Sequence, residues 1–106
     1  MSKKPVQTKA EIYQILGDHQ STIIDYGVKR LGLFGSFVRQ QQQTDSDVDL
    51  LVDFESNQKK YANFIGLVYF LEDVLHRPVE LITSDSLTKH LKPHIEKEVE
   101  YVVLGK

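Results

Sequence analysis

Apolar residues recur every three or four positions in several segments of the chain, a spacing typical of amphipathic helices. The longest such segment covers residues 62–75. Another begins at Thr8, because Thr8 and Glu11 form the Thr-x-x-Glu pattern of a capping box. Two shorter segments, at residues 20–26 and 93–98, show the same periodicity. The pattern therefore predicts helices towards both ends of the chain and a long one in its middle.

Three segments are shorter and are either apolar runs or alternate between apolar and polar residues, as strands do: residues 28–34, 47–54 and 79–83. The connection between the first two is too short for a full helical crossover, so we expect these strands to be antiparallel. The predicted fold class is α/β (or α+β), with a small mixed three-stranded sheet and helices packed on it. The length predicts a single domain over residues 1–106.

Composition narrows the class of protein without indicating an activity. Hydrophobic residues make up 41% of the chain and charged residues 26%, as in ordinary soluble globular domains. The absence of cysteine excludes disulfides and thiol catalysis, and it fits a cytoplasmic location. The net charge of -2 does not favour bulk binding to nucleic acid. No apolar run approaches the roughly 20 residues that a membrane-spanning helix needs.

A glycine and a serine follow the first predicted strand directly and begin a short helix. Gly35 allows backbone N–H groups to approach a phosphate closely, and Ser36 adds a hydroxyl donor. Arg39, three residues further on, is expected near the same helix end, where its guanidinium can reach phosphate. Taken alone, these residues fit an ordinary capped turn and an exposed arginine equally well.

Two aspartates, Asp47 and Asp49, stand two positions apart at the start of the second predicted strand, so their carboxylates point the same way. Like charges held together repel each other unless a cation lies between them. Mg²⁺ prefers one or two carboxylates together with substrate phosphates. Two solvated aspartates at a strand entrance are the simpler alternative. Beside a phosphate-binding bend, however, the pair predicts a site where anion and cation lie side by side.

Glu80 is the acidic residue of the third predicted strand, and alternation places it opposite Val79 and Leu81. In two-metal phosphoryl transfer, a third carboxylate holds the second ion and helps to remove the proton from the attacking hydroxyl. This role for Glu80 is a hypothesis. A position at the edge of the sheet is the alternative explanation for a lone acid in an apolar strand.

Gly35-Ser36, followed by ten residues and Asp47-Val48-Asp49, resembles the G-S-x10-D-x-D signature of the polymerase-beta-like nucleotidyltransferase superfamily. The wider sequence around both motifs is similar to the minimal nucleotidyltransferase (MNT) branch, whose members have about this length. The resemblance implies a nucleotidyltransferase fold that uses ATP and Mg²⁺, with two ions expected. It assigns Gly35 and Ser36 to the nucleotide phosphates, where position adds Arg39, and it assigns Asp47, Asp49 and Glu80 to Mg²⁺ and catalysis.

Many MNT proteins are antitoxins encoded beside a HEPN-domain ribonuclease toxin. The resemblance implies that this chain transfers AMP to a hydroxyl of such a toxin, a tyrosine in particular, and forms a hetero-oligomer with it. One departure is Glu80, since the family usually has aspartate there, and the extra methylene shifts the carboxylate enough to disturb near-attack geometry. Two alternatives stay open: transfer to a small molecule such as an aminoglycoside, and a non-catalytic antitoxin that acts by binding.

Overall fold

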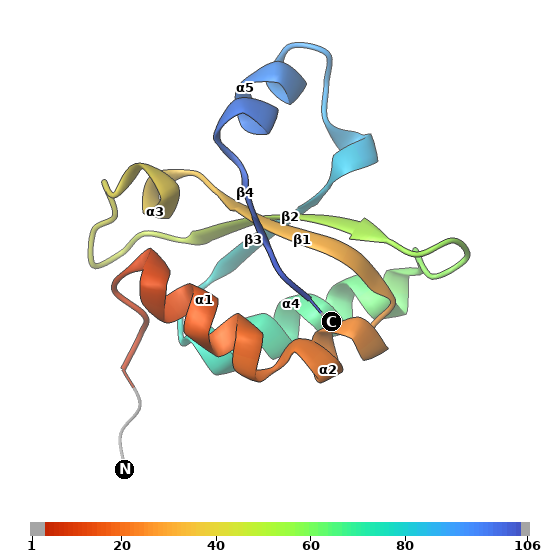
Figure 1. Cartoon of the computed structure of the whole chain (residues 1–106), viewed down its shortest axis with the longest axis horizontal. Coiled ribbons are helices and arrows are strands. Elements are labelled where there is room, and N and C mark those ends of the chain that lie inside the picture. The colour runs from red at the N-terminus through yellow and green to blue at the C-terminus, as the bar shows by residue number, and fades with distance from the viewer. Residues whose placement is uncertain (1–3, 105–106) are drawn as a thin grey trace.

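The computed structural model describes residues 4–104 and contains a mixed sheet with helices on both faces (Figure 1). The ends of the predicted domain, residues 1–3 and 105–106, lie outside the described residues. The strands are β1 (Val28–Phe34), β2 (Val48–Phe54), β3 (Val79–Thr83) and β4 (Glu100–Val102), in the order β3-β2-β1-β4. Strand β1 is antiparallel to β2 and β4, and β2 is parallel to β3. The predicted mixed sheet and antiparallel first pair are confirmed.

The prediction of three strands was wrong, because the described part of the chain contains four. Strand β4 has three residues, too few for an alternating pattern to identify it. It forms because β1 offers an unpaired edge and a glycine at the crossing. A Cβ atom on Gly32 would come within 2.5 Å of Cγ2 of Val99, so the C-terminal segment passes directly over Gly32.

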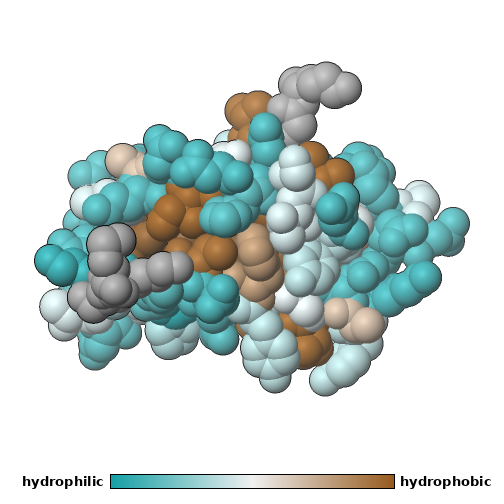
Figure 2. All heavy atoms as spheres, turned by 90° about the horizontal axis from the view of Figure 1, so that it is seen from below, coloured by the Kyte–Doolittle hydropathy of each residue, from teal (hydrophilic) through white to brown (hydrophobic). Residues whose placement is uncertain are grey.

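Three helices cover one face of the sheet: α1 (Lys9–Asp18), α2 (Gln20–Asp25) and α4 (Tyr61–Leu75) (Figure 1). Fully buried leucines, isoleucines and valines from these helices and from the strands form the main core: Ile12, Leu16, Ile23, Leu31, Leu33, Val48, Leu50, Val52, Leu67, Leu71 and Leu75. Seen from this side, the surface is mostly hydrophilic with a smaller apolar patch (Figure 2), as expected for amphipathic helices that turn their apolar sides inward. No helix within residues 4–104 is long and apolar enough to cross a lipid bilayer.

The predicted helices are present with their ends shifted by one or two residues. Thr8 caps α1 by accepting a hydrogen bond from the Glu11 backbone N–H at 3.1 Å. The reciprocal half of the capping box differs from the prediction, because the Glu11 carboxylate accepts from the N–H of Gln7 instead of Thr8. Helix α4 ends at Leu75, and the left-handed backbone of the next residue, His76 (φ 57°), turns the chain towards Pro78 and β3.

The opposite face of the sheet carries less structure. The short η1 (Ser84–Ser86) and α5 (Leu91–Glu98) lie over it (Figure 1). A small apolar cluster holds them there, built on the buried residues Phe34, Leu51 and Ile95 with Ile82, Leu87 and Val99 packed around them. Helix α5 begins two residues before the predicted start and contributes Ile95 as its buried residue.

Candidate active site

Asp49 and Glu80 lie side by side on the face covered by α5. The parallel pairing of β2 with β3 aligns them directly, so both side chains project to the same side of the sheet. They line a pocket of about 540 Å³ bounded by Phe34, Gly35, Arg39, Asp49, Glu80, His94, Ile95 and Glu98. Strand β3 is one of the two edge strands of the sheet, so Glu80 is both an edge residue and a pocket residue.

Gly35 forms the bend that joins β1 to the single-turn helix α3 (Ser36–Arg39). Its backbone has φ of +83° and ψ of -152°, a conformation that residues other than glycine rarely adopt. A Cβ atom at this position would also overlap the carboxylate of Asp49. Glycine is therefore required twice here, by conformation and by space, and the bend and Asp49 are in direct contact.

Two of the residues singled out in the sequence lie outside the lining of this pocket. Asp47 precedes β2 by one residue and is exposed, and Ser36 begins α3 and is partly buried. Asp47 is still near enough to Asp49 to act on its charge. The structure thus brings Gly35, Arg39, Asp49 and Glu80 to one pocket, and it leaves Ser36 and Asp47 beside it.

The electrostatics of the pocket are strained by negative charge. The pKa of Asp49 is raised to about 6, first by burial and then by the nearby charges of Glu80 and Asp47. Arg39 opposes this shift without cancelling it. A carboxylate that holds its proton this tightly gains from a cation placed against it.

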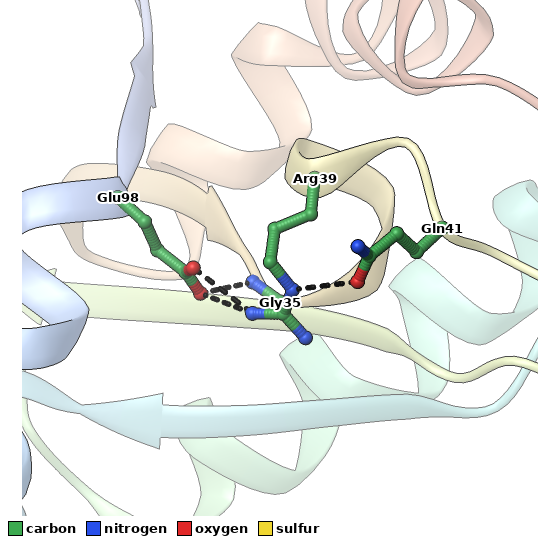
Figure 3. A network of polar contacts seen from close by, with 4 residues as sticks. All are labelled: Gly35, Arg39, Gln41 and Glu98. Carbon is green, nitrogen blue, oxygen red and sulfur yellow. Dashed lines mark hydrogen bonds and ion pairs between the residues drawn. The ribbon is translucent and has the colours of Figure 1, made fainter.

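Glu98, at the end of α5, is a site residue that the sequence did not indicate (Figure 3). Its Oε2 accepts a hydrogen bond from the backbone N–H of Gly35 at 2.7 Å. Its Oε1 accepts from the guanidinium of Arg39 at 2.9 Å, and Nε of Arg39 donates to the Gln41 side chain at 3.2 Å. The two groups expected to bind phosphate are therefore already holding an anion.

The sequence does not indicate Glu98 as a site residue because it stands 63 positions away from Gly35. Helical spacing offers a signal that could have found it. His94 and Glu98 stand four residues apart and so share a side of α5, next to Ile95, which docks the helix on the sheet. His94 is exposed and also lines the pocket.

The acidic residues suit a hard divalent cation that arrives with a phosphorylated ligand. Within residues 4–104, no three acidic or histidine side chains lie close enough together to hold a metal ion by themselves. Mg²⁺ commonly takes only one or two carboxylates and completes its shell with water and substrate phosphates. Asp49 and Glu80, aligned on neighbouring strands and mutually repelling, are a donor set of that kind.

The chain resembles known proteins over most of its length. The model of a family described as nucleotidyltransferase domain matches residues 11–103. The chain is 40% identical to the protein adenylyltransferase MntA of Thermococcus cleftensis, and the match covers 90% of this chain and 96% of that protein. A solved structure named as a candidate minimal nucleotidyltransferase superposes with a TM-score of 0.68 and 26% identity, over 83% of this chain and 93% of the other.

A second solved structure shares the fold at lower identity. It is a complex of a tri-AMPylated HEPN toxin with an MNT antitoxin from Shewanella oneidensis. The match has a TM-score of 0.57 and 17% identity, and it covers 88% of this chain and 73% of the other.

Proposed function

Because this chain belongs to the nucleotidyltransferase domain family, in its minimal nucleotidyltransferase branch, we propose that it transfers AMP from ATP to a hydroxyl of a HEPN-domain toxin. The family is one of transferases. The observation that carries the proposal is the alignment of Asp49 with Glu80 beside the Gly35 bend, in one open pocket. The nucleotide, the metal, the toxin and its tyrosine are parts of the proposal.

In this proposal the phosphates of ATP take the place of the Glu98 carboxylate. The Gly35 N–H and the Arg39 guanidinium already bind one anionic group, at 2.7 and 2.9 Å. A triphosphate presents the same oxygen acceptors with more charge. Ser36, next to the bend, supplies a further hydroxyl donor from the start of α3.

The three acidic residues would hold Mg²⁺, with two ions expected when ATP is bound. Asp49 and Glu80 face the pocket, and Asp47 stands next to them at the start of β2. When bound, Mg²⁺ neutralises charge on the phosphates and on the leaving pyrophosphate. Glu80 orients the acceptor hydroxyl and takes its proton as the hydroxyl attacks the α-phosphate. The chain itself needs to supply little more than placement and electrostatics.

In this proposal the acceptor comes from a second protein. Helix α5 contributes part of the pocket lining, and the lining residues Arg39, Glu80 and His94 are exposed. A pocket this open does not enclose a small acceptor by itself. The Shewanella oneidensis complex supports a toxin partner, since a protein of the same fold is bound there to a HEPN toxin that carries AMP groups. We place both partners in the cytoplasm.

Mass spectrometry of the toxin encoded beside this chain tests the proposal. After incubation with ATP and Mg²⁺, the toxin should gain the mass of one or more AMP groups. The Asp49→Asn variant should lose at least about 10²-fold in rate, because it removes charge stabilisation at the reacting phosphates. Asp53→Asn is the matched control, since Asp53 lies on the same strand but pairs with Arg30 and does not line the pocket.

Two other outcomes would contradict transfer to a toxin. Full neutralisation of the toxin by Asp49→Asn would support a binding antitoxin if the toxin gains no mass with either the variant or the unaltered protein. Transfer of AMP to an aminoglycoside in a parallel assay, with an unmodified toxin, would support the small-molecule alternative.

A further inference from the structure

A buried arginine, which forms no ion pair with an acidic side chain among the described residues, lies close to the proposed site. Arg77, in the connection between α4 and β3, is only 7% exposed. Within residues 4–104, the acceptors of its hydrogen bonds are all backbone carbonyls. A buried guanidinium is costly unless its donors are satisfied, so this set of carbonyls is what makes the position tolerable.

Most of these carbonyls belong to the loop that leads into β2. Nη1 of Arg77 donates to the carbonyls of Thr44 and Ser46 at 3.0 Å each, and to that of Gln43 at 3.3 Å. Nε donates to the carbonyl of Val6, just before α1. The loop residues 40–47 belong to no strand or helix, so Arg77 supplies partners that a ladder would otherwise provide.

Asp47 lies between two points that this connection fixes. The Ser46 carbonyl, immediately before Asp47, accepts from Arg77. The Val48 N–H, immediately after it, donates to the carbonyl of Pro78 at 2.9 Å. Consecutive residues, Arg77 and Pro78, thus hold the backbone on both sides of Asp47.

The guanidinium of Arg77 also contacts α3, the helix that follows the Gly35 bend. Its Cζ lies 5.2 Å from the ring centroid of Phe37, a distance at which a cation and a ring face attract each other. Phe37 is 1% exposed and stands in α3, two residues after Gly35. Arg77 therefore touches both the loop that carries Asp47 and the helix that follows the Gly35 bend, although it does not line the pocket.

We propose that Arg77 is a positioning residue, which fixes Asp47 relative to Asp49 and the Gly35 bend and thereby supports metal-dependent nucleotide binding. Its planar fork of donors can serve several carbonyls at once, whereas the ammonium of a lysine is a compact point charge on a flexible stem. The part about nucleotide binding rests on the function proposed above. The part about the loop does not.

Arg77→Lys and Arg77→Met test this inference, with Arg30→Met as the matched control. Arg30 is an arginine bonded to Asp53 at 2.7 Å, and it does not line the pocket. Hydrogen exchange of the ligand-free proteins should show faster exchange over residues 43–48 in both Arg77 variants and no change there in Arg30→Met. Arg77→Lys keeps the charge and is the variant chosen to retain the fold if Arg77→Met does not.

Binding of Mn²⁺–ATP, measured by calorimetry and by the Mn²⁺ resonance signal, gives the second readout. Arg77→Lys should weaken it by about 10-fold or more, as loss of an outer-sphere partner does at metal sites. Binding of ATP in EDTA should change much less, because Gly35 and Arg39 keep their places. A purely structural role would weaken both kinds of binding together.

Unchanged exchange over residues 43–48 in folded Arg77→Lys and Arg77→Met would overturn the inference. Equal weakening of ATP binding with and without metal would overturn it too. If the unaltered protein binds no nucleotide but the Arg77 variants still loosen this loop, the proposed function fails and the loop-positioning role stands.

Discussion

The two faces of the sheet are built on opposite principles. On the face covered by α1, α2 and α4, fully buried aliphatic side chains fill the space between the layers. On the other face, α5 is held by a small cluster based on Phe34, Leu51 and Ile95 and by polar contacts at its C-terminal end, and charged residues line the pocket beside it. A single strand, β2, serves both, since Leu50 enters the main core and its neighbour Asp49 enters the pocket. Stability and chemistry are thus separated by the alternation of side chains along one strand.

Shortening a side chain in the core beneath α1, α2 and α4 should have the largest effect on stability. Leu71 in α4 is fully buried in the main core. Leu71→Ala should lower the free energy of unfolding by about 2–5 kcal/mol, since it removes apolar burial and leaves a cavity. Urea denaturation measures this directly. In the variant that remains folded, Mn²⁺–ATP affinity should stay within about twofold, because distant sites act independently. A selective loss of binding at preserved stability would contradict the division between the faces.

Gly35→Ala should have a smaller effect on stability and a larger one on the site. The backbone conformation of Gly35 (φ +83°, ψ -152°) costs alanine of the order of 1–3 kcal/mol, and the added Cβ displaces the Asp49 carboxylate. We expect thermal unfolding to shift modestly and Mn²⁺–ATP binding to be lost. Gly17→Ala is the control, because nothing lies within 4 Å of a Cβ atom there. Unimpaired binding by Gly35→Ala would show that the bend does not form part of the nucleotide site.

The sequence predicts the face beneath α1, α2 and α4 better than the face that carries the pocket. The reason is the distance along the sequence between the residues that interact. The strands Val28–Phe34 and Val79–Thr83 follow from local patterns and begin and end where predicted. Alternation also places Asp49 and Glu80 on a common side once β2 and β3 pair in parallel. Strand β4 and Glu98 depend on pairing with β1 and with Gly35, far away in the sequence. No local pattern indicates such contacts, because they follow from where the C-terminal segment crosses the sheet.

The charge of Asp49 should make the site face a source of instability. Its pKa in the folded protein is about 6, above the usual value of 3.8, so the folded state binds the proton more tightly than the unfolded chain. Stability is therefore lost as the pH rises through this range, and the penalty is complete above about pH 6. Asn in place of Asp49 carries no such penalty. In EDTA at pH 7.5, Asp49→Asn should exceed the unaltered protein in stability by about 1 kcal/mol, a figure reduced for partial exposure.

The comparison at low pH is the internal control for this prediction. Near pH 3 Asp49 is largely protonated in both the folded and the unfolded state, so the advantage of Asp49→Asn should shrink towards zero. Chemical denaturation at the two pH values measures the difference. An Asp49→Asn variant that is less stable than the unaltered protein at pH 7.5 would show that Asp49 is held by favourable contacts instead of being crowded by negative charge.

Glu98→Gln should have the smallest effect. Whether it strengthens or weakens ATP binding shows whether α5 competes with the nucleotide or helps to bind it. Glu98 binds the Gly35 N–H and pairs with Arg39 at 2.9 Å, and Arg39 is half exposed. Such a pair is worth up to about 1 kcal/mol, so removing the charge should tighten ATP binding by as much as about fivefold if phosphate displaces the carboxylate. Glu96→Gln, on the same helix and outside the pocket lining, should leave ATP affinity unchanged. Weaker binding by Glu98→Gln would instead mean that Glu98 holds Arg39 ready for the nucleotide, and that α5 belongs to the binding site as a wall and is not a competitor for it.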